Sequence, residues 1–244
     1  MRVKSEVGKK IIVALDVENA EEALSLVQKL DAAEIFKVGL RLFTAEGPSL
    51  LEKIRKQGKM VFLDLKLHDI PSTVAEAVRA GVRHDVAMMT LHASGGKEMM
   101  IRAEEAARDE AEKRSLNKPF LLGVTVLTSL RNEDLKELGI REGIEQHVLR
   151  LARLVKESGL GGAVCSAREL EIIRSELGKD FTLVVPGIRP ALAAAHDQKR
   201  IMTPAQALEK GAGYLVIGRP IIKAPSPEEA FSKIVEELTW TIHK

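Results

Sequence analysis

FLDLKLHDIP, residues 62–71, is the stretch of this sequence that decides the fold. Read as a β-strand, it sends successive side chains to opposite faces. The aliphatic residues at the odd positions 61–67 form one apolar face, and Asp64 and Lys66 lie on the other. Pro71 cannot continue a central strand, so the strand ends near Asp69. The sequence therefore predicts a carboxylate, an ammonium group and a second carboxylate at the carboxyl end of a buried strand. A purely structural ion pair explains a lone D-x-K pattern equally well, because buried charges are paired whatever their role.

The composition is that of an ordinary globular protein with a sizeable core. The chain has 244 residues, of which 45% are apolar and 30% are charged. Aromatic residues make up only 3%, so aliphatic side chains must fill the core, and stacking platforms for single-stranded nucleic acid are not expected. The net charge is +2 and the basic residues are dispersed, which argues against a nucleic-acid or membrane partner.

The N-terminal region and the single cysteine indicate where in the cell the protein is located. Residues 1–10 are charged, and the apolar run 11–15 is interrupted by Asp16 and is too short for a signal peptide or a membrane span. One cysteine, Cys165, excludes an internal disulfide and a Cys-rich metal site. No base lies beside it in the sequence, so we interpret it as a small core residue. A cytoplasmic location is expected.

Hydrophobic periodicity predicts eight strands that alternate with eight helices. The strands are expected at residues 11–17, 35–40, 61–67, 86–92, 120–128, 162–166, 182–188 and 214–218. The helices are expected at residues 20–30, 46–56, 72–83, 97–114, 144–158 and 167–177, from Thr203-Pro204 onward, and at 227–240, with a polar loop at 129–141. No composition break divides the chain, so the prediction is an α/β protein formed by a single (β/α)8 TIM barrel over residues 1–244. A doubly wound open sheet is the main alternative, although no Gly-rich fingerprint follows the first strand.

Polar residues gather at the carboxyl ends of the predicted strands. They are Asp16, Lys37, Asp64, Lys66, His92, Thr128, Arg189, Gly218 and Arg219. Chance would scatter them over both ends of a barrel, whereas catalytic residues of such barrels lie at this end. A functional site is the better interpretation, although a structural role is favoured for His68 and a packing role explains His92 equally well.

The loops after strands seven and eight are the usual phosphate-binding region of a TIM barrel. In this chain they carry Gly187, Arg189, Gln198, Gly218 and Arg219. Glycine lets backbone N–H groups approach an anion, and arginine supplies a forked cation. The loop 189–202 is longer than most connections of its kind and could close over a ligand. Together these features predict a site for a phosphate monoester.

Several motifs resemble those of the orotidine 5′-phosphate decarboxylase family, bacterial type. They are DLKLHDIP at 64–71, ALD at 14–16, FKVG at 36–39, VLTS at 126–129, PGIR at 186–189 and VIGR at 216–219. The motifs occur in order and cover essentially the whole chain. The resemblance implies a TIM-barrel enzyme, cytoplasmic and homodimeric, that converts orotidine 5′-monophosphate to UMP and CO2. This reaction is the last step of UMP synthesis, and the resemblance implies neither a cofactor nor a metal.

The resemblance also implies a role for each matching residue. Lys66 would protonate C6 of the pyrimidine, and Lys37, Asp64, Lys66 and Asp69 would form an alternating charge network. Asp69, with Ile70 and Thr73, would reach the site of the partner subunit. The remaining contacts would be Asp16 and Lys37 to the ribose, Thr128 to the pyrimidine, and Arg189, Gln198, Gly218 and Arg219 to the phosphate.

The chemistry of such a reaction agrees with these residues. Loss of CO2 from C6 leaves an electron pair in the plane of the ring, where resonance cannot spread it. The sequence shows no cofactor motif that would supply an electron sink. A fixed positive charge such as the Lys66 ammonium must then stabilise the carbanion, and Asp64 and Asp69 would keep this lysine protonated and oriented. A carboxylate facing the substrate carboxylate would also raise the energy of the ground state.

Two other functions stay open at this point. A Mg²⁺-dependent sugar-phosphate decarboxylase or aldolase of the same superfamily would share the D-x-K-x-x-D spacing. It would need a further carboxylate for the metal and would have no use for Gln198 or a pyrimidine contact. A non-catalytic nucleotide-binding barrel would have little use for a repulsive buried carboxylate beside Lys66.

Overall fold

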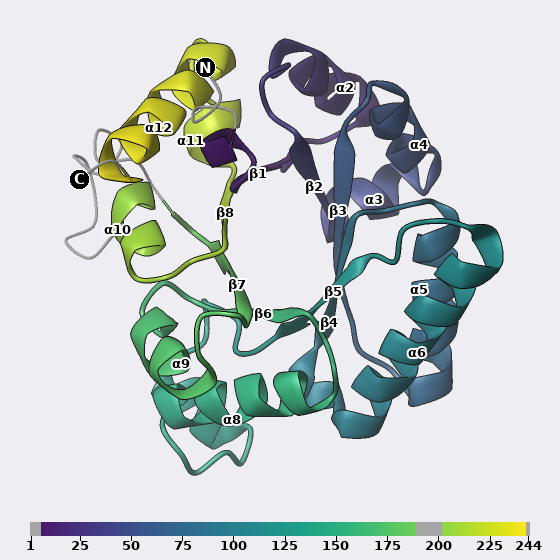
Figure 1. Cartoon of the computed structure of the whole chain (residues 1–244), viewed down its shortest axis with the longest axis vertical. Coiled ribbons are helices and arrows are strands. Elements are labelled where there is room, and N and C mark those ends of the chain that lie inside the picture. The colour runs from purple at the N-terminus through teal and green to yellow at the C-terminus, as the bar shows by residue number, and fades with distance from the viewer. Residues whose placement is uncertain (1–5, 189–201, 243–244) are drawn as a thin grey trace.

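The computed structural model describes residues 6–188 and 202–242, in which parallel strands close into a barrel (Figure 1). The strands are β1 (Ile11–Ala14), β2 (Ile35–Gly39), β3 (Met60–Leu67), β4 (Met88–His92), β5 (Phe120–Val124), β6 (Gly162–Val164), β7 (Thr182–Pro186) and β8 (Tyr214–Ile217). They pair in chain order, and β8 pairs with β1 through the register Val13↔Ile217. This closure confirms the predicted barrel and excludes the open sheet.

Helices surround the barrel on its outside (Figure 1). They are α2 (Ala20–Lys29), α3 (Leu40–Glu46), α4 (Ser49–Lys56), α5 (Pro71–Arg83), η1 (Ala93–Gly95), α6 (Lys97–Arg114), α7 (Asn132–Glu137), α8 (Ile144–Glu157), α9 (Leu170–Leu177), α10 (Pro204–Glu209), α11 (Arg219–Ile222) and α12 (Pro227–Ile242). Within residues 6–188 and 202–242, none of these helices has the length and hydropathy to cross a membrane.

Three helical segments differ from the sequence-based expectation. The helix expected at 46–56 is preceded by a separate helix, α3, because Gly47 has a positive φ of 65° and Pro48 follows it. The loop expected at 129–141 contains α7, and the short helix α11 directly follows β8. The start of α10 is as predicted, since the Thr203 side chain accepts a hydrogen bond from the backbone N–H of Gln206.

The alternation of side chains along the strands separates two apolar layers. The barrel interior contains Ile12, Ala14, Ile35, Phe62, Met88, Leu122, Val184 and Val216. Strand residues of the opposite parity, such as Phe36, Val38, Val61 and Leu63, pack against the helices in the larger cluster. Lys37, Asp64 and Thr90 have the same parity as the interior residues, so their side chains lie above the apolar floor of the barrel, at its carboxyl end.

Several strands end earlier than their apolar runs predict. β1 ends at Ala14 and β5 at Val124, whereas ends at Val17 and Thr128 were expected. Asp16 and Thr128 therefore lie in βα connections and not on the strands. Beyond Val124, Thr125 still bonds to β6, with its backbone N–H and its hydroxyl both donating to the Val164 carbonyl. An apolar run thus overestimates strand length, because loop residues packed over the barrel are apolar as well.

Candidate active site

Asp64 is the centre of an ion-pair network at the carboxyl end of the barrel. Its Oδ1 accepts a hydrogen bond from Lys66 Nζ at 2.8 Å, and its Oδ2 lies 3.5 Å from Lys37 Nζ. Lys37 Nζ also contacts Asp16 Oδ1 at 3.3 Å. The structure therefore brings together four of the residues that the sequence predicted for the site, from β2, β3 and the connection after β1.

The charges of the network stabilise one another. Asp64 is buried, with 8% of its surface exposed. Burial by itself would raise the pKa of its carboxyl group, but the positive charges of Lys37 and Lys66 and the hydrogen bonds from Lys66 and Thr90 outweigh burial, so the pKa lies below the usual range. Asp64 is consequently ionised at neutral pH, and two ammonium groups share its charge.

The backbone of β3 is irregular at Lys66, which corrects the simple alternation expected from the sequence. Lys66 has a φ of +52°, a conformation that costs energy for a residue with a Cβ atom. The pairing with β4 also shifts here, since Leu63 faces Met89 but Leu67 faces Leu91. The four residues from Leu63 to Leu67 on β3 thus span the same length as the two from Met89 to Leu91 on β4. The additional residues of β3 form a bulge that includes Lys66.

Thr90 on β4 forms hydrogen bonds with Asp64 and Lys66 of this irregular segment. Its hydroxyl oxygen accepts a hydrogen bond from the backbone N–H of Lys66 at 2.9 Å, and the hydroxyl donates to Asp64 Oδ1 at 2.9 Å. Only 1% of Thr90 is exposed. From the sequence, Thr90 was placed on the same face as His92, where the pair could contact a ligand, and no bond to Asp64 or Lys66 was expected. Its inward parity on β4, two residues before His92, was the one available signal.

Two histidines lie beside the network. The rings of His68 and His92 are 5.4 Å apart and tilted, and His68 is exposed. Burial lowers the pKa of His92, and the nearby His68 and Lys66 lower it further against the opposing charge of Asp64. His92 is therefore neutral at physiological pH, which limits the positive charge near Lys66.

A cavity of about 350 Å³ opens above the network. Its polar lining includes Asp16, Lys37, Asp64, Lys66, Thr128 and Arg219, and its apolar lining includes Phe62, Val124, Val164 and Val216. This volume and this combination of polar and apolar lining residues suit a small organic ligand. Cys165 also lines the cavity, but it is buried and burial raises the pKa of its thiol well above the usual value, so it is a core residue and not a nucleophile.

Two glycines leave space for the charged side chains of the cavity. A Cβ atom at Gly39 would lie 3.0 Å from Lys37 Nζ, and one at Gly218 would lie 3.2 Å from Asp16 Oδ2. Larger residues at either position would displace these polar groups. Gly218, which was predicted to contact a phosphate, therefore also leaves room for the Asp16 carboxylate.

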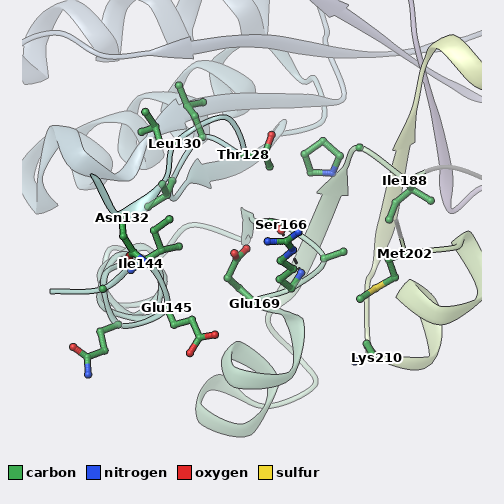
Figure 2. A pocket seen from close by; sticks show the side chains of 18 of the residues that line it. Thr128, Leu130, Asn132, Ile144, Glu145, Ser166, Glu169, Ile188, Met202 and Lys210 are labelled. Carbon is green, nitrogen blue, oxygen red and sulfur yellow. Dashed lines mark hydrogen bonds between the residues drawn. The ribbon is translucent and has the colours of Figure 1, made fainter. Parts of the chain in front are cut away.

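A wider hollow of about 990 Å³ adjoins the cavity on the side of β5, β6 and β7 (Figure 2). Figure 2 shows Asn132, Ile144 and Glu145 on one side of it, and Met202 and Lys210 on the other. Ile188 and Met202, the described residues on either side of segment 189–201, both line this hollow. The predicted phosphate contacts Arg189 and Gln198 lie outside the described residues.

The three residues predicted to reach a partner subunit are exposed. Asp69 Oδ1 accepts a hydrogen bond from the backbone N–H of Ile70, and 64% of Ile70 is exposed. Thr73, near the start of α5, is also exposed. Among the described residues, Asp69 forms no ion pair with Lys66, so within one chain the structure brings only Asp64 to this lysine.

No three His, Cys, Asp or Glu side chains of residues 6–188 and 202–242 gather in an arrangement that could hold a metal ion. The carboxylates of the site, Asp16 and Asp64, are instead paired with lysines.

Comparisons with known proteins agree with the geometry. Residues 9–234 match the model of the "Orotidine 5′-phosphate decarboxylase / HUMPS family". A protein of Trichlorobacter lovleyi named orotidine 5′-phosphate decarboxylase is 50% identical over 236 residues, which cover 96% of this chain and 97% of the relative. A protein of the same name from Nostoc sp. is 47% identical over 234 residues, which cover 96% of this chain and 98% of the relative. The crystal structure of orotidine 5′-phosphate decarboxylase from Lactobacillus acidophilus superimposes with a TM-score of 0.84 at 36% identity, covering 94% of this chain and 99% of that one.

Proposed function

This chain belongs to the orotidine 5′-phosphate decarboxylase / HUMPS family, and we propose that it decarboxylates orotidine 5′-monophosphate to UMP and CO2. The observation that carries the proposal is the Lys66 ammonium group, held 2.8 Å from a buried carboxylate in a cavity that Gly218 and Arg219 also line. The names of the close relatives support the same substrate. The reaction would complete UMP synthesis in the cytoplasm.

The proposed chemical step needs only side chains of the protein. The bond between C6 and the carboxylate breaks, CO2 leaves, and the electron pair stays on C6. The Lys66 ammonium stabilises this charge and transfers a proton from Nζ to C6, and solvent later restores the proton of the neutral amine. Asp64, ionised and bonded to Lys66, holds the donor in place.

Binding contacts remote from C6 would orient the substrate. Asp16 and Lys37, which pair at 3.3 Å, are proposed to hold the ribose hydroxyl groups, and Thr128 to contact the pyrimidine. Gly218 and Arg219, with Arg189 and Gln198, are proposed to hold the phosphate. Binding energy from the phosphate would then be available to position the reacting carbon against Lys66.

We expect wild-type protein to consume orotidine 5′-monophosphate rapidly in excess EDTA, because no step above requires a metal. The loss of substrate absorbance measures this turnover. Activity that appears only after Mg²⁺ is restored would instead favour a sugar-phosphate decarboxylase or aldolase. No turnover under either condition, together with tight binding of UMP, would indicate a non-catalytic nucleotide-binding barrel.

Asp69 is proposed to complete the site of a second subunit in a homodimer, together with Ile70 and Thr73. Their exposure supports this, as does the exposure of Leu40 at 57%, which lines a hollow beside Lys37 and Lys66. We propose that Leu40 and Ile70 belong to one apolar surface that the second subunit covers.

Mixing two inactive variants tests the shared site. Lys66→Ala and Asp69→Ala subunits that exchange at random give one working site in each mixed dimer, so about a quarter of the wild-type activity per subunit is expected. Each variant alone serves as the control. If the mixture stays inactive after mass spectrometry has shown that subunits exchanged, Asp69 acts within its own chain and the shared site is wrong.

A further inference from the structure

The bulge in β3 changes the hydrogen bonding of the Lys66 backbone N–H group, which bonds to a side chain of β4. Because the ladder between β3 and β4 is shifted from Leu63 to Leu67, the backbone N–H of Lys66 has no regular carbonyl partner opposite it. An unpaired N–H group near a barrel interior is costly. In the structure this N–H donates to the hydroxyl oxygen of Thr90 at 2.9 Å.

The same hydroxyl closes a ring of hydrogen bonds around Lys66. The Thr90 O–H donates to Asp64 Oδ1 at 2.9 Å, and this carboxylate oxygen accepts from Lys66 Nζ at 2.8 Å. The backbone and the ammonium end of Lys66 are thus tied to one another through two other residues. A hydroxyl can do this because it accepts and donates at once, whereas an apolar side chain of the same shape can do neither.

We propose that Thr90 is a positioning residue that fixes the Lys66 ammonium group and the Asp64 carboxylate for the reaction, through its two hydrogen bonds. Thr90 does not line the cavity, so it acts through these two residues and not on the substrate. The strained φ of Lys66 supports this assignment, since such conformations persist only where surrounding contacts impose them. This inference rests on the proposed function only for its kinetic test.

Replacing Thr90 by valine removes the hydroxyl and keeps the shape of the side chain. Since small displacements of a reacting group are costly, kcat is expected to fall by about 10- to 100-fold, with KM changed by less than about threefold. Thr90→Ser keeps the hydroxyl and is expected to recover most of the lost kcat. Rescue by serine is the signature of hydrogen bonding, because serine fills the site less well than valine does.

The pH dependence gives a second readout that a loss of packing would not change. The groups around Asp64 are Lys37 on β2, Lys66 on β3, His92 on β4 and, through Lys37, Asp16 after β1. Thr90 contributes one of the hydrogen bonds that lower the pKa of Asp64. In Thr90→Val the pKa of this carboxyl group should therefore rise, and the acidic limb of the kcat/KM profile should move to higher pH.

Thr125→Val is the matched control. Thr125 is buried, and its hydroxyl donates to the Val164 carbonyl on the next strand at 2.9 Å and not to Lys66 or Asp64. Its loss is expected to lower thermal stability without moving kcat or the acidic limb. If Thr90→Val does not fold, Thr90→Ala removes the same hydroxyl without placing a methyl group beside the carboxylate.

The outcomes separate this inference from the proposed function. NMR titration of the Asp64 carboxyl carbon in the free protein measures the effect of Thr90 whatever the enzyme acts on. An unchanged Asp64 titration in the folded variant, or wild-type kcat, overturns the role of Thr90. A wild-type protein that does not consume orotidine 5′-monophosphate overturns the proposed function instead, and the titration then decides about Thr90 alone.

Discussion

Replacing Lys66 by alanine is expected to lower kcat on orotidine 5′-monophosphate by at least about 10⁴-fold, because the change removes a proton donor and a fixed positive charge together. KM is expected to change much less, since the proposed phosphate and ribose contacts stay intact. Steady-state kinetics at a much higher enzyme concentration than the wild type needs, with substrate still in excess, measure the residual rate. A kcat within about tenfold of the wild type would show that Lys66 has no central role.

Lys59, directly before β3, provides a matched control. It precedes β3 at the opposite end of the barrel, where its Nζ donates to the backbone oxygen of Asp31 at 2.6 Å and pairs with Asp31 Oδ1 at 3.2 Å. Its side chain is 12% exposed, which makes it at least as enclosed as that of Lys66. Lys59→Ala is expected to keep full activity, so a loss of rate in both variants would indicate a general effect on β3 and not catalysis.

Replacing Asp64 by asparagine is expected to lower kcat by about 10²- to 10³-fold. The substitution keeps the size of the side chain but leaves the ammonium groups of Lys37 and Lys66 without their shared carboxylate. Removal of that charge breaks the ion pairs of both lysines and releases Lys66 from its anchor. Steady-state kinetics over a range of pH measure the loss of kcat, and a thermal melt of the same preparation shows how much of the protein is folded.

Stability is expected to fall as well, because Asp64 is buried and every partner loses a contact. A loss of about 1–3 kcal/mol in the free energy of unfolding is typical of a buried polar group left without its partner. The pKa of Asp64 lies below its value in an unfolded chain, so its stabilisation is complete above that unfolded value and is lost as the pH falls through the folded value. The difference in Tm between the wild type and Asp64→Asn should therefore shrink in acid.

Asp31→Asn is the corresponding control for the carboxylate. Asp31 pairs with Lys59 but is 96% exposed, so its ion pair is expected to contribute little to stability. Neither kcat nor the acid dependence of Tm should change. If Asp64→Asn behaved like this control, the network around Asp64 would contribute neither to catalysis nor to stability.

The sequence by itself determined the fold class and which strand residues face the barrel interior. Alternating aliphatic residues fixed which face of each strand packs against the helices, and the chain order of strands and helices required parallel pairing. The same parity placed Lys37, Asp64 and Thr90 on the inner face. These features are local, so they can be read without knowing which strands become neighbours.

Only the tertiary structure decided how the inner residues meet. The positive φ of Lys66 depends on the shifted register between β3 and β4, and a register is a long-range property that no local pattern encodes. For the same reason the sequence did not indicate that the Thr90 hydroxyl bonds to Asp64. The resemblance assigned Asp69 to the site of a partner subunit, and in the structure this residue is exposed and forms no ion pair with Lys66 among the described residues. The sequence determined which groups face the barrel interior, and the packing of neighbouring strands determined which of them touch.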